Sequence, residues 1–126
     1  MARSKVWDNT ALYLAKTALT GKVIASRVRV ADTLRSRATG LLNRSSLDQD
    51  EGLLIVPCDS IHTLFMRFPI DILYLDKEMM VVHAVSKIPP FRLSFCLGRA
   101  QSVLELKAGT VPEEIVGQRL IFEKQH

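Results

Sequence analysis

The strongest constraint on the fold of this chain is an apolar stretch in its middle that carries a few polar side chains. Apolar residues fill positions 53–56 and 72–75. Continuous apolar runs rich in β-branched and aromatic residues are typical of strands buried on both faces, so we predict buried strands here. His62, Arg67 and Asp71 interrupt this setting, and a buried polar group costs free energy unless it is paired or faces water. We therefore expect these three residues to form either a binding site or a structural network.

The chain length and composition predict one globular domain spanning residues 1–126. A chain of 126 residues can bury one core but is short for two. Its 48% hydrophobic and 24% charged residues are ordinary for a globular protein. No stretch approaches the ~20 apolar residues that span a bilayer. The N-terminal segment also lacks the apolar centre of a secretory signal. We expect a cytoplasmic protein with no membrane contact.

Cysteine and histidine usage gives little support to metal or cofactor chemistry. Cys58 and Cys96 are far apart in the sequence and lie among apolar residues, where a reduced cysteine acts as a small hydrophobe. Cys58 and His62 form the only closely spaced pair of metal-ligand types, and zinc sites need a second one. Nucleotide-binding glycine patterns and a G-x-S-x-G elbow are both missing from the sequence. We expect no metal and no cofactor, and we leave open whether the protein is an enzyme.

The net charge of +4 raises the question of nucleic-acid binding. The basic residues are spread along the chain, and only residues 27–44 approach a cluster. No aromatic residue interleaves with that cluster to stack on bases. A mildly basic solvated surface explains the charge better, so nucleic acid is an unlikely partner.

The order of predicted elements favours a mostly β fold. Strands are expected at 23–31, 70–75, 79–85, 101–106 and 119–122, with a hairpin turn at 76–78. Residues 11–19 fit either a helical turn or a short strand, and residues 91–96 fit a flap or an irregular edge. One short helix is predicted after Asp32, and a second one starts at Thr110 and closes at Gly117. These strands and helices together predict an antiparallel β-sandwich or a partly closed barrel with two short helices.

Several polar residues are candidates for binding a ligand. Arg37 and Arg44 would share a face of the first helix, either as solvated arginines or as a pair aimed at a carboxylate or phosphate. Glu105 is expected on the outer face of the 101–106 strand, where it could pair with one of these arginines. The complete candidate set is Arg37, Arg44, His62, Thr63, Met66, Arg67, Asp71 and Glu105. A structural ion pair between Arg67 and Asp71 is the alternative for those two residues.

Four segments of the chain resemble domain of unknown function family 192. They are Arg37-Ala38-Thr39-Gly40-Leu41-Leu42-Asn43-Arg44, residues 52–57, residues 60–71, and residues 103–109 with Gly117. Their order and spacing match from about residue 31 to 122. The resemblance implies a compact β-rich fold with short helices and supplies no reaction. Many members have Trp-Met-Lys-Asn where this chain reads Phe65-Met66-Arg67-Phe68, so a contact made by that asparagine does not transfer to Phe68.

Two functions of different classes remain open at this point. The first is binding of a small ligand, with an anion favoured by the arginines, in a cleft around residues 60–71. The second is a non-enzymatic accessory module that binds a partner protein through an apolar surface within residues 88–97. Convergence of the polar candidates in one pocket favours the first function. An exposed patch containing Phe91, Leu93 and Phe95 favours the second.

Overall fold

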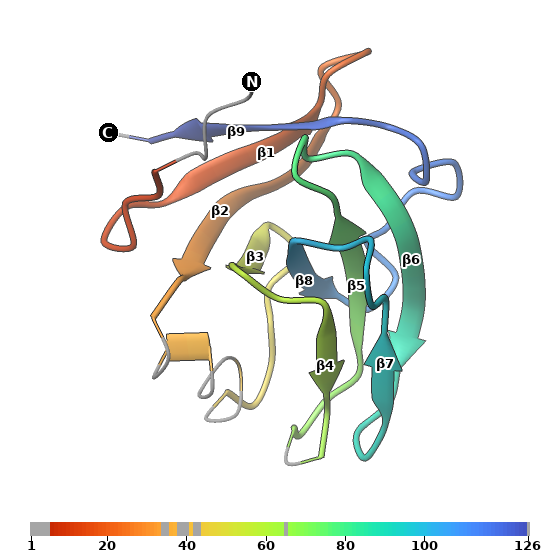
Figure 1. Cartoon of the computed structure of the whole chain (residues 1–126). Coiled ribbons are helices and arrows are strands. Elements are labelled where there is room, and N and C mark those ends of the chain that lie inside the picture. The colour runs from red at the N-terminus through yellow and green to blue at the C-terminus, as the bar shows by residue number, and fades with distance from the viewer. Residues whose placement is uncertain (1–5, 34–35, 38–40, 42–43, 65, 126) are drawn as a thin grey trace.

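Alternating and continuous apolar segments of the sequence become strands in the computed structural model (Figure 1). The structure describes residues 6–33, 36, 37, 41, 44–64 and 66–125. The strands formed by these residues are β1 (Tyr13–Thr17), β2 (Val23–Ala31), β3 (Glu51–Ile55), β4 (Ser60–His62), β5 (Ile70–Leu75), β6 (Val81–Ile88), β7 (Leu93–Phe95), β8 (Ser102–Lys107) and β9 (Leu120–Lys124). The prediction of a mostly β fold is confirmed.

Seven of these strands form one sheet in the order β6-β5-β8-β3-β2-β1-β9, and β4 and β7 form a separate two-stranded ribbon. All pairs in the large sheet are antiparallel except β2 and β3, which run parallel. The expected antiparallel pairing therefore holds for every pair of the large sheet except β2–β3. A parallel pair needs a long crossover, and residues 32–50 supply it between β2 and β3.

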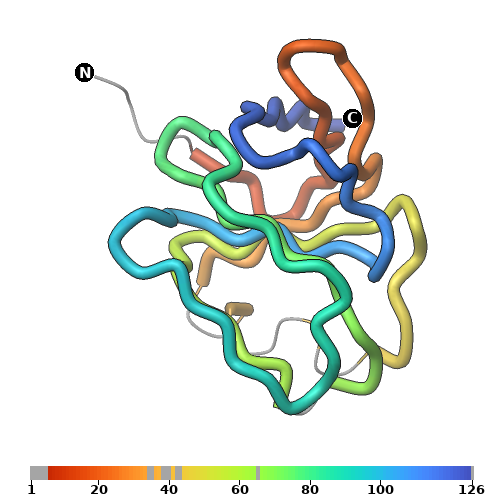
Figure 2. Tube along the Cα trace, turned by 90° about the vertical axis from the view of Figure 1, so that its right-hand side faces the viewer, coloured from red at the N-terminus to blue at the C-terminus, as the bar shows by residue number. Residues whose placement is uncertain are grey.

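The large sheet curls until its two edge strands approach each other. Met80, just before β6, pairs with Arg119, just before β9. The amide of Val81 also donates to the carbonyl of Gln118 at 2.8 Å. Of the two predicted architectures, the structure has the partly closed barrel. Figure 2, turned from Figure 1, shows both termini at one end of the molecule and the turn near residue 90 at the other.

Both faces of the central strands are covered, which explains their continuous apolar sequence. Leu73, Leu104 and Leu106 face one buried cluster, inside the curl with residues of β1, β2 and β9. Ile72 and Val103 face a second buried cluster, which includes Ile61 of β4. All six residues of β5 are buried as a result. The prediction of a solvated face on the 101–106 strand is wrong, because the ribbon side of the molecule covers that face.

The two predicted helices are not supported. Residues 110–117 form turns instead, and the side chain of Asp71 binds the amides of Thr110 and Val111, which would have opened the helix. The first predicted helix falls largely outside the described residues. Ser36 and Arg37 have helical geometry there, but no helix is established among the described positions. Across the part of the chain that the structure describes, no helix is long and apolar enough to cross a membrane.

The predicted hairpin between β5 and β6 is confirmed. Leu75 pairs with Val81 across the turn. The carboxylate of Asp76 accepts hydrogen bonds from the amides of Glu78 and Met80, each at 2.9 Å, which closes the turn from within. The ambiguous segment 11–19 is the strand β1.

Candidate functional site

The β4–β7 ribbon has one buried face and one exposed face. On the buried face, Ile61 pairs with Ser94, and the Tyr74 hydroxyl donates to the Ser94 Oγ at 2.8 Å. Burial raises the pKa of the Tyr74 phenol, so the hydroxyl stays protonated and can donate. On the exposed face, His62 lies opposite Leu93. The ribbon is therefore fastened to the large sheet while its outer face remains open.

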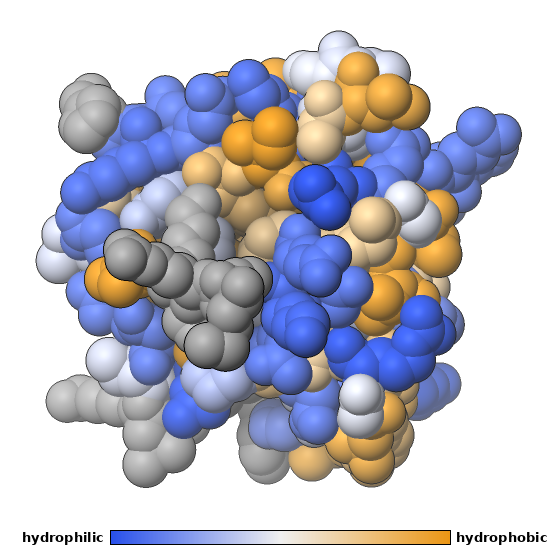
Figure 3. All heavy atoms as spheres, turned by 45° about the horizontal axis from the view of Figure 1, so that its top comes forward, coloured by the Kyte–Doolittle hydropathy of each residue, from blue (hydrophilic) through white to orange (hydrophobic). Residues whose placement is uncertain are grey.

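Four large exposed apolar residues lie at every second position of the segment 91–97, and two of them, Leu93 and Phe95, belong to β7. Phe91, Leu93, Phe95 and Leu97 are 68%, 60%, 58% and 66% exposed, and we call them the apolar stripe. Alternate residues of a strand point to the same face, so the sequence pattern itself places Leu93 and Phe95 side by side. Figure 3 shows apolar side chains, in orange, gathered at the lower right of that view, on the side where Figure 1 places β6 and β7. Contiguous exposed apolar patches commonly mark interaction surfaces.

Thr63 fixes the loop that leads into the apolar stripe. Its side chain is fully buried, and its hydroxyl donates to the carbonyl of Pro89 at 2.7 Å and accepts from the amide of Arg92 at 2.9 Å. The backbone of Thr63 adds two bonds, one to the Arg92 carbonyl and one from the Phe91 amide, both at 2.9 Å. Thr63 therefore positions the start of β7.

Asp71 is a structural carboxylate. It is completely buried on β5, on the face opposite that of Ile72. Its Oδ1 accepts from the amide of Lys87 at 2.7 Å, and its Oδ2 accepts from the amides of Gly109, Thr110 and Val111 at 2.9, 3.0 and 3.0 Å. The ion pair predicted with Arg67 does not form among the described residues, because backbone amides occupy the carboxylate.

Glu105 lies on the other face of the sheet, beside Ile72 and Leu53 in its register. It is 4% exposed, and burial raises the pKa of its carboxyl from 4.5 to about 7. None of the residues that the structure describes donates a hydrogen bond to this carboxyl or forms an ion pair with it. The thiol of Cys58 is close enough for the two groups to interact electrostatically. Glu105 is thus half protonated near neutral pH in an apolar setting.

The two arginines of the candidate set have separate partners. Arg44 forms an ion pair with Glu51, in which the single nitrogen Nη2 donates to both carboxylate oxygens, at 2.8 and 3.1 Å. Partial burial disfavours the ionised Glu51, but the hydrogen bonds from Arg44 and from the Asp48 amide, with the positive charges of Arg44 and Arg27, together outweigh this effect and lower the pKa of Glu51. Arg37 donates to the carbonyl of Pro57 at 3.1 Å. The predicted pairing of either arginine with Glu105 is not present among the described residues.

The remaining candidates divide between surface and core. His62 and Arg67 are exposed, whereas Met66 is buried in the cluster that also surrounds Glu105. The structure therefore brings Met66 and Glu105 to one face of the sheet and leaves Asp71 on the other. Their role toward a ligand stays a prediction.

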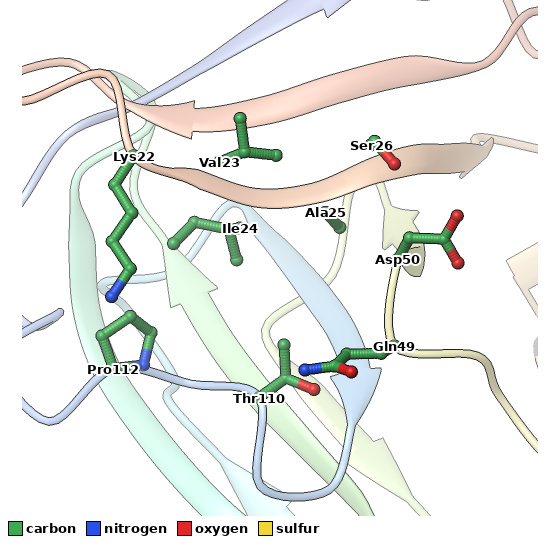
Figure 4. A pocket seen from close by; sticks show the side chains of 9 residues that line it. All are labelled: Lys22, Val23, Ile24, Ala25, Ser26, Gln49, Asp50, Thr110 and Pro112. Atoms are coloured by element: carbon green, nitrogen blue, oxygen red, sulfur yellow. The ribbon is translucent and has the colours of Figure 1, made fainter.

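One surface hollow lies beside β2, away from the candidate set. It measures about 540 Å³ and has nine lining residues, Lys22, Val23, Ile24, Ala25, Ser26, Gln49, Asp50, Thr110 and Pro112. Figure 4 shows the first residues of β2 on one side of it and Thr110 and Pro112 on the other. The hollow forms because β3 pairs with β2 only from Arg27 onward. It offers one cation, Lys22, and one carboxylate, that of Asp50, which is already bound to Arg27 at 2.8 Å.

A smaller hollow of about 270 Å³ contains a cysteine. Its lining residues are Pro57, Cys58, Asp59, Ala100 and Gln101. Burial raises the pKa of the Cys58 thiol, and a thiol that stays protonated is a poor nucleophile and metal ligand. Within the described part of the chain, no three His, Cys, Asp or Glu side chains gather as a metal site.

The sequence carried a signal for the apolar stripe but not for the buried acid. Alternating large apolar residues at 91, 93, 95 and 97 are visible in the sequence, and the expected patch contained the first three. Glu105 also alternates with apolar residues, and that pattern alone places a glutamate on a solvated face. The covering of this face by distant segments was not visible in the sequence.

A family comparison agrees with this architecture. The model of domain of unknown function family 192, described as Uncharacterized ACR, matches residues 15–121. The chain belongs to this family. A family relative, a UPF0127 protein from Thermococcus sibiricus, is 31% identical over 96 residues, which cover 72% of the chain and 61% of the relative. The chain thus spans about three fifths of the length of that curated relative.

Two solved structures share the fold of this family member. A protein of unknown function from Novosphingobium aromaticivorans has a TM-score of 0.74 at 19% identity, over 87% of this chain and 83% of the other. A protein from Sinorhizobium meliloti, provisionally assigned as a transcription regulator, has a TM-score of 0.75 at 23% identity, over 89% and 92%. At these identities the similarity concerns the fold alone.

Proposed function

We propose that this protein is a non-enzymatic binding module that docks a partner protein on the outer face of the β4–β7 ribbon. The observation that carries the proposal is the apolar stripe, four large side chains within residues 91–97 that are each more than half exposed. An isolated exposed apolar residue is ordinary, but a contiguous row is a recognised feature of interaction surfaces.

The stripe has the composition of an interface centre. Phe91 and Phe95 supply two aromatic rings, and aromatic residues are enriched at protein interfaces. Full burial of a Phe or Leu side chain is favourable by about 1.5–3 kcal/mol, before the costs of association are subtracted. Burial of these four residues would therefore be the main favourable contribution to a complex.

The ribbon is held in place before any partner arrives. Thr63 binds both the Pro89 carbonyl and the Arg92 amide, and Ser94 is bonded to Tyr74 below the ribbon. A surface that is already ordered loses less conformational entropy on binding. The stripe therefore presents a fixed shape to a partner.

The alternative of a small ligand in a cleft around residues 60–71 has less support. Of its polar candidates, Asp71 and Thr63 are hydrogen-bonded to backbone groups, and Arg44 is paired with Glu51. The hollow beside β2 contains none of these candidates. Glu105 is the one acidic candidate left without a donor among the described residues.

The test compares two double variants that remove exposed apolar side chains. Leu93→Ser with Phe95→Ser removes the two central side chains of the stripe, and Leu19→Ser with Val116→Ser removes two apolar residues from other parts of the surface that are 87% and 55% exposed. Each protein is used as bait in a lysate of the source organism, and any captured partner is then purified and titrated against all three baits. We expect the stripe variant to lose at least about tenfold in affinity and the matched control to bind like the wild type, since interface energy concentrates in a few central residues. Equal binding by all three baits, or no partner for any of them, would overturn the proposal.

A further inference from the structure

The charges around the apolar stripe point to the kind of partner it receives. Resting on the proposed function, we infer that the partner presents apolar side chains flanked by Asp or Glu. The charged residues on and beside the stripe are mostly cations: Arg92 and Arg99 come from its own segment, and Arg67 comes from the turn that follows β4. One acid, the half-buried Asp59, lies next to it, and its backbone carbonyl accepts from the amide of Cys96 at 2.8 Å. All three arginines are exposed. Residues 60–70 and 88–99 together contain no aspartate or glutamate.

These border cations differ from several others on the surface. Elsewhere, five cations are paired with carboxylates, in the ion pairs Lys16–Glu123, Arg27–Asp50, Arg44–Glu51, Arg119–Glu78 and Lys124–Asp8. Among the described residues, none of Arg67, Arg92 and Arg99 has a carboxylate partner. Arg92 makes one side-chain hydrogen bond, to the carbonyl of Phe91 at 3.2 Å. The positive charge around the stripe is therefore left for an external group.

An acidic partner fits this border better than a second copy of the chain does. Two copies meeting through the stripe would bring arginine against arginine, and opposed like charges disfavour a complex. A carboxylate beside each arginine would instead gain a charge-assisted hydrogen bond, which is bidentate at best for a guanidinium. Complementary charges also speed the encounter and make it dependent on salt. An apolar centre with an acidic border is thus the chemical complement of this surface.

The test uses a random-peptide display library selected on the wild-type protein, with subtraction on the Leu93→Ser/Phe95→Ser variant. We expect the recovered peptides to combine Phe, Leu, Ile or Trp with Asp or Glu. The strongest peptide is then synthesised and titrated against Arg92→Glu/Arg99→Glu. A matched control, Lys22→Glu/Lys77→Glu, changes the net charge equally at exposed positions outside the two ribbon segments.

We expect the border variant to lose at least about tenfold in affinity and the control to lose much less. A peptide in which Lys replaces each acidic residue should bind the border variant more tightly than it binds the wild type. Apolar peptides without acidic residues, unaffected by charge reversal, would overturn the inference and leave the proposed function standing. If no selected peptide binds the wild type more tightly than the stripe variant, both the inference and the proposed function are overturned.

Two further measurements cover the other occupants of the surface. If the wild type sediments as a dimer and the stripe variant as a monomer, the surface binds a second copy of the chain and not an acidic partner, which would overturn the inference. Binding to vesicles of phosphatidylglycerol but not of phosphatidylcholine, lost in the stripe variant and unaccompanied by peptide binding, would replace it with an anionic lipid surface. We expect a monomer and no stripe-dependent vesicle binding.

Discussion

The carboxylate of Asp71 lies 2.9 Å from the amide nitrogen of Gly109, so a side chain at the start of β5 holds the turn that follows β8. Gly109 has a φ of +86°, in the left-handed region where glycine is favoured. The same carboxylate also holds Lys87 near the end of β6. Three neighbouring strands are thus tied at one end by a single buried acid, which makes Asp71 part of the architecture.

Asp71→Asn should destabilise the protein strongly. The carboxylate accepts four amide hydrogen bonds, and an amide side chain would turn an N–H group toward donors on one of its two sides. Leaving buried amides without an acceptor costs about 1–3 kcal/mol for each group, so we expect a loss of several kcal/mol. Urea unfolding followed by circular dichroism measures this. A loss below about 1 kcal/mol would contradict the structural role.

Glu105 should make the protein less stable as the pH rises. The unfolded chain releases this proton near its ordinary pKa of 4.5, and the folded protein holds it until about 7. Between these values the folded state binds more protons, so stability is full below 4.5 and falls until the pH has passed 7. The total effect is about 3 kcal/mol.

Glu105→Gln isolates this effect because its side chain has nearly the same shape and no ionisation. Urea unfolding of both proteins at pH 5 and pH 8 gives the difference between them at each pH, which removes contributions from other titrating groups. From pH 5 to pH 8, we expect the free energy of unfolding of Glu105→Gln to increase relative to that of the wild type by about 2–3 kcal/mol. Parallel pH profiles would show that the acid is not buried as a lone group.

Thr63→Val should loosen the ribbon. The substitution keeps the shape and removes a hydroxyl that bonds to Pro89 and Arg92. The buried carbonyl and amide lose their partner, and we expect a loss of about 1–3 kcal/mol. Hydrogen exchange of the Arg92 amide should accelerate more than exchange in β5. Thr63→Ser retains the hydroxyl and serves as the control, which should exchange like the wild type.

His62→Ala should leave the free energy of unfolding almost unchanged. The side chain is exposed on the outer face of β4, opposite Leu93, and surface substitutions usually change stability by less than about 0.5 kcal/mol. Thermal unfolding checks this expectation directly. A loss above about 1 kcal/mol would mean that the imidazole supports the ribbon and does not simply border the stripe.

Much of the backbone architecture was predictable because it follows from local patterns. The alternation in residues 23–31 and the apolar run at 70–75 gave two strands with the bounds that the structure has for β2 and β5. The hairpin turn at Asp76 was equally readable, because its side chain completes the turn within five residues. The family resemblance was also readable from the sequence and is confirmed.

The candidate site was less predictable, because its polar residues find their partners far along the chain. Asp71 binds amides of residues 87 and 109–111, and Thr63 binds residues 89–92. The predicted second helix was wrong for the same reason, since Asp71 holds the amides with which that helix would have begun. A pattern of single residues does not reveal which distant amide will face a given carboxylate.

The sequence by itself determined which segments are strands, where the main hairpin turns and which alternating residues share a face. The tertiary structure decided which of those faces are covered, and therefore which polar residues are buried and which remain exposed. Periodicity places Leu93 with Phe95 and Glu105 with Val103, but it treats both pairs alike. The packing of the β4–β7 ribbon on the sheet leaves the first pair exposed and buries the second. Burial depends on contacts between segments far apart in sequence, and those contacts exist only in the folded chain.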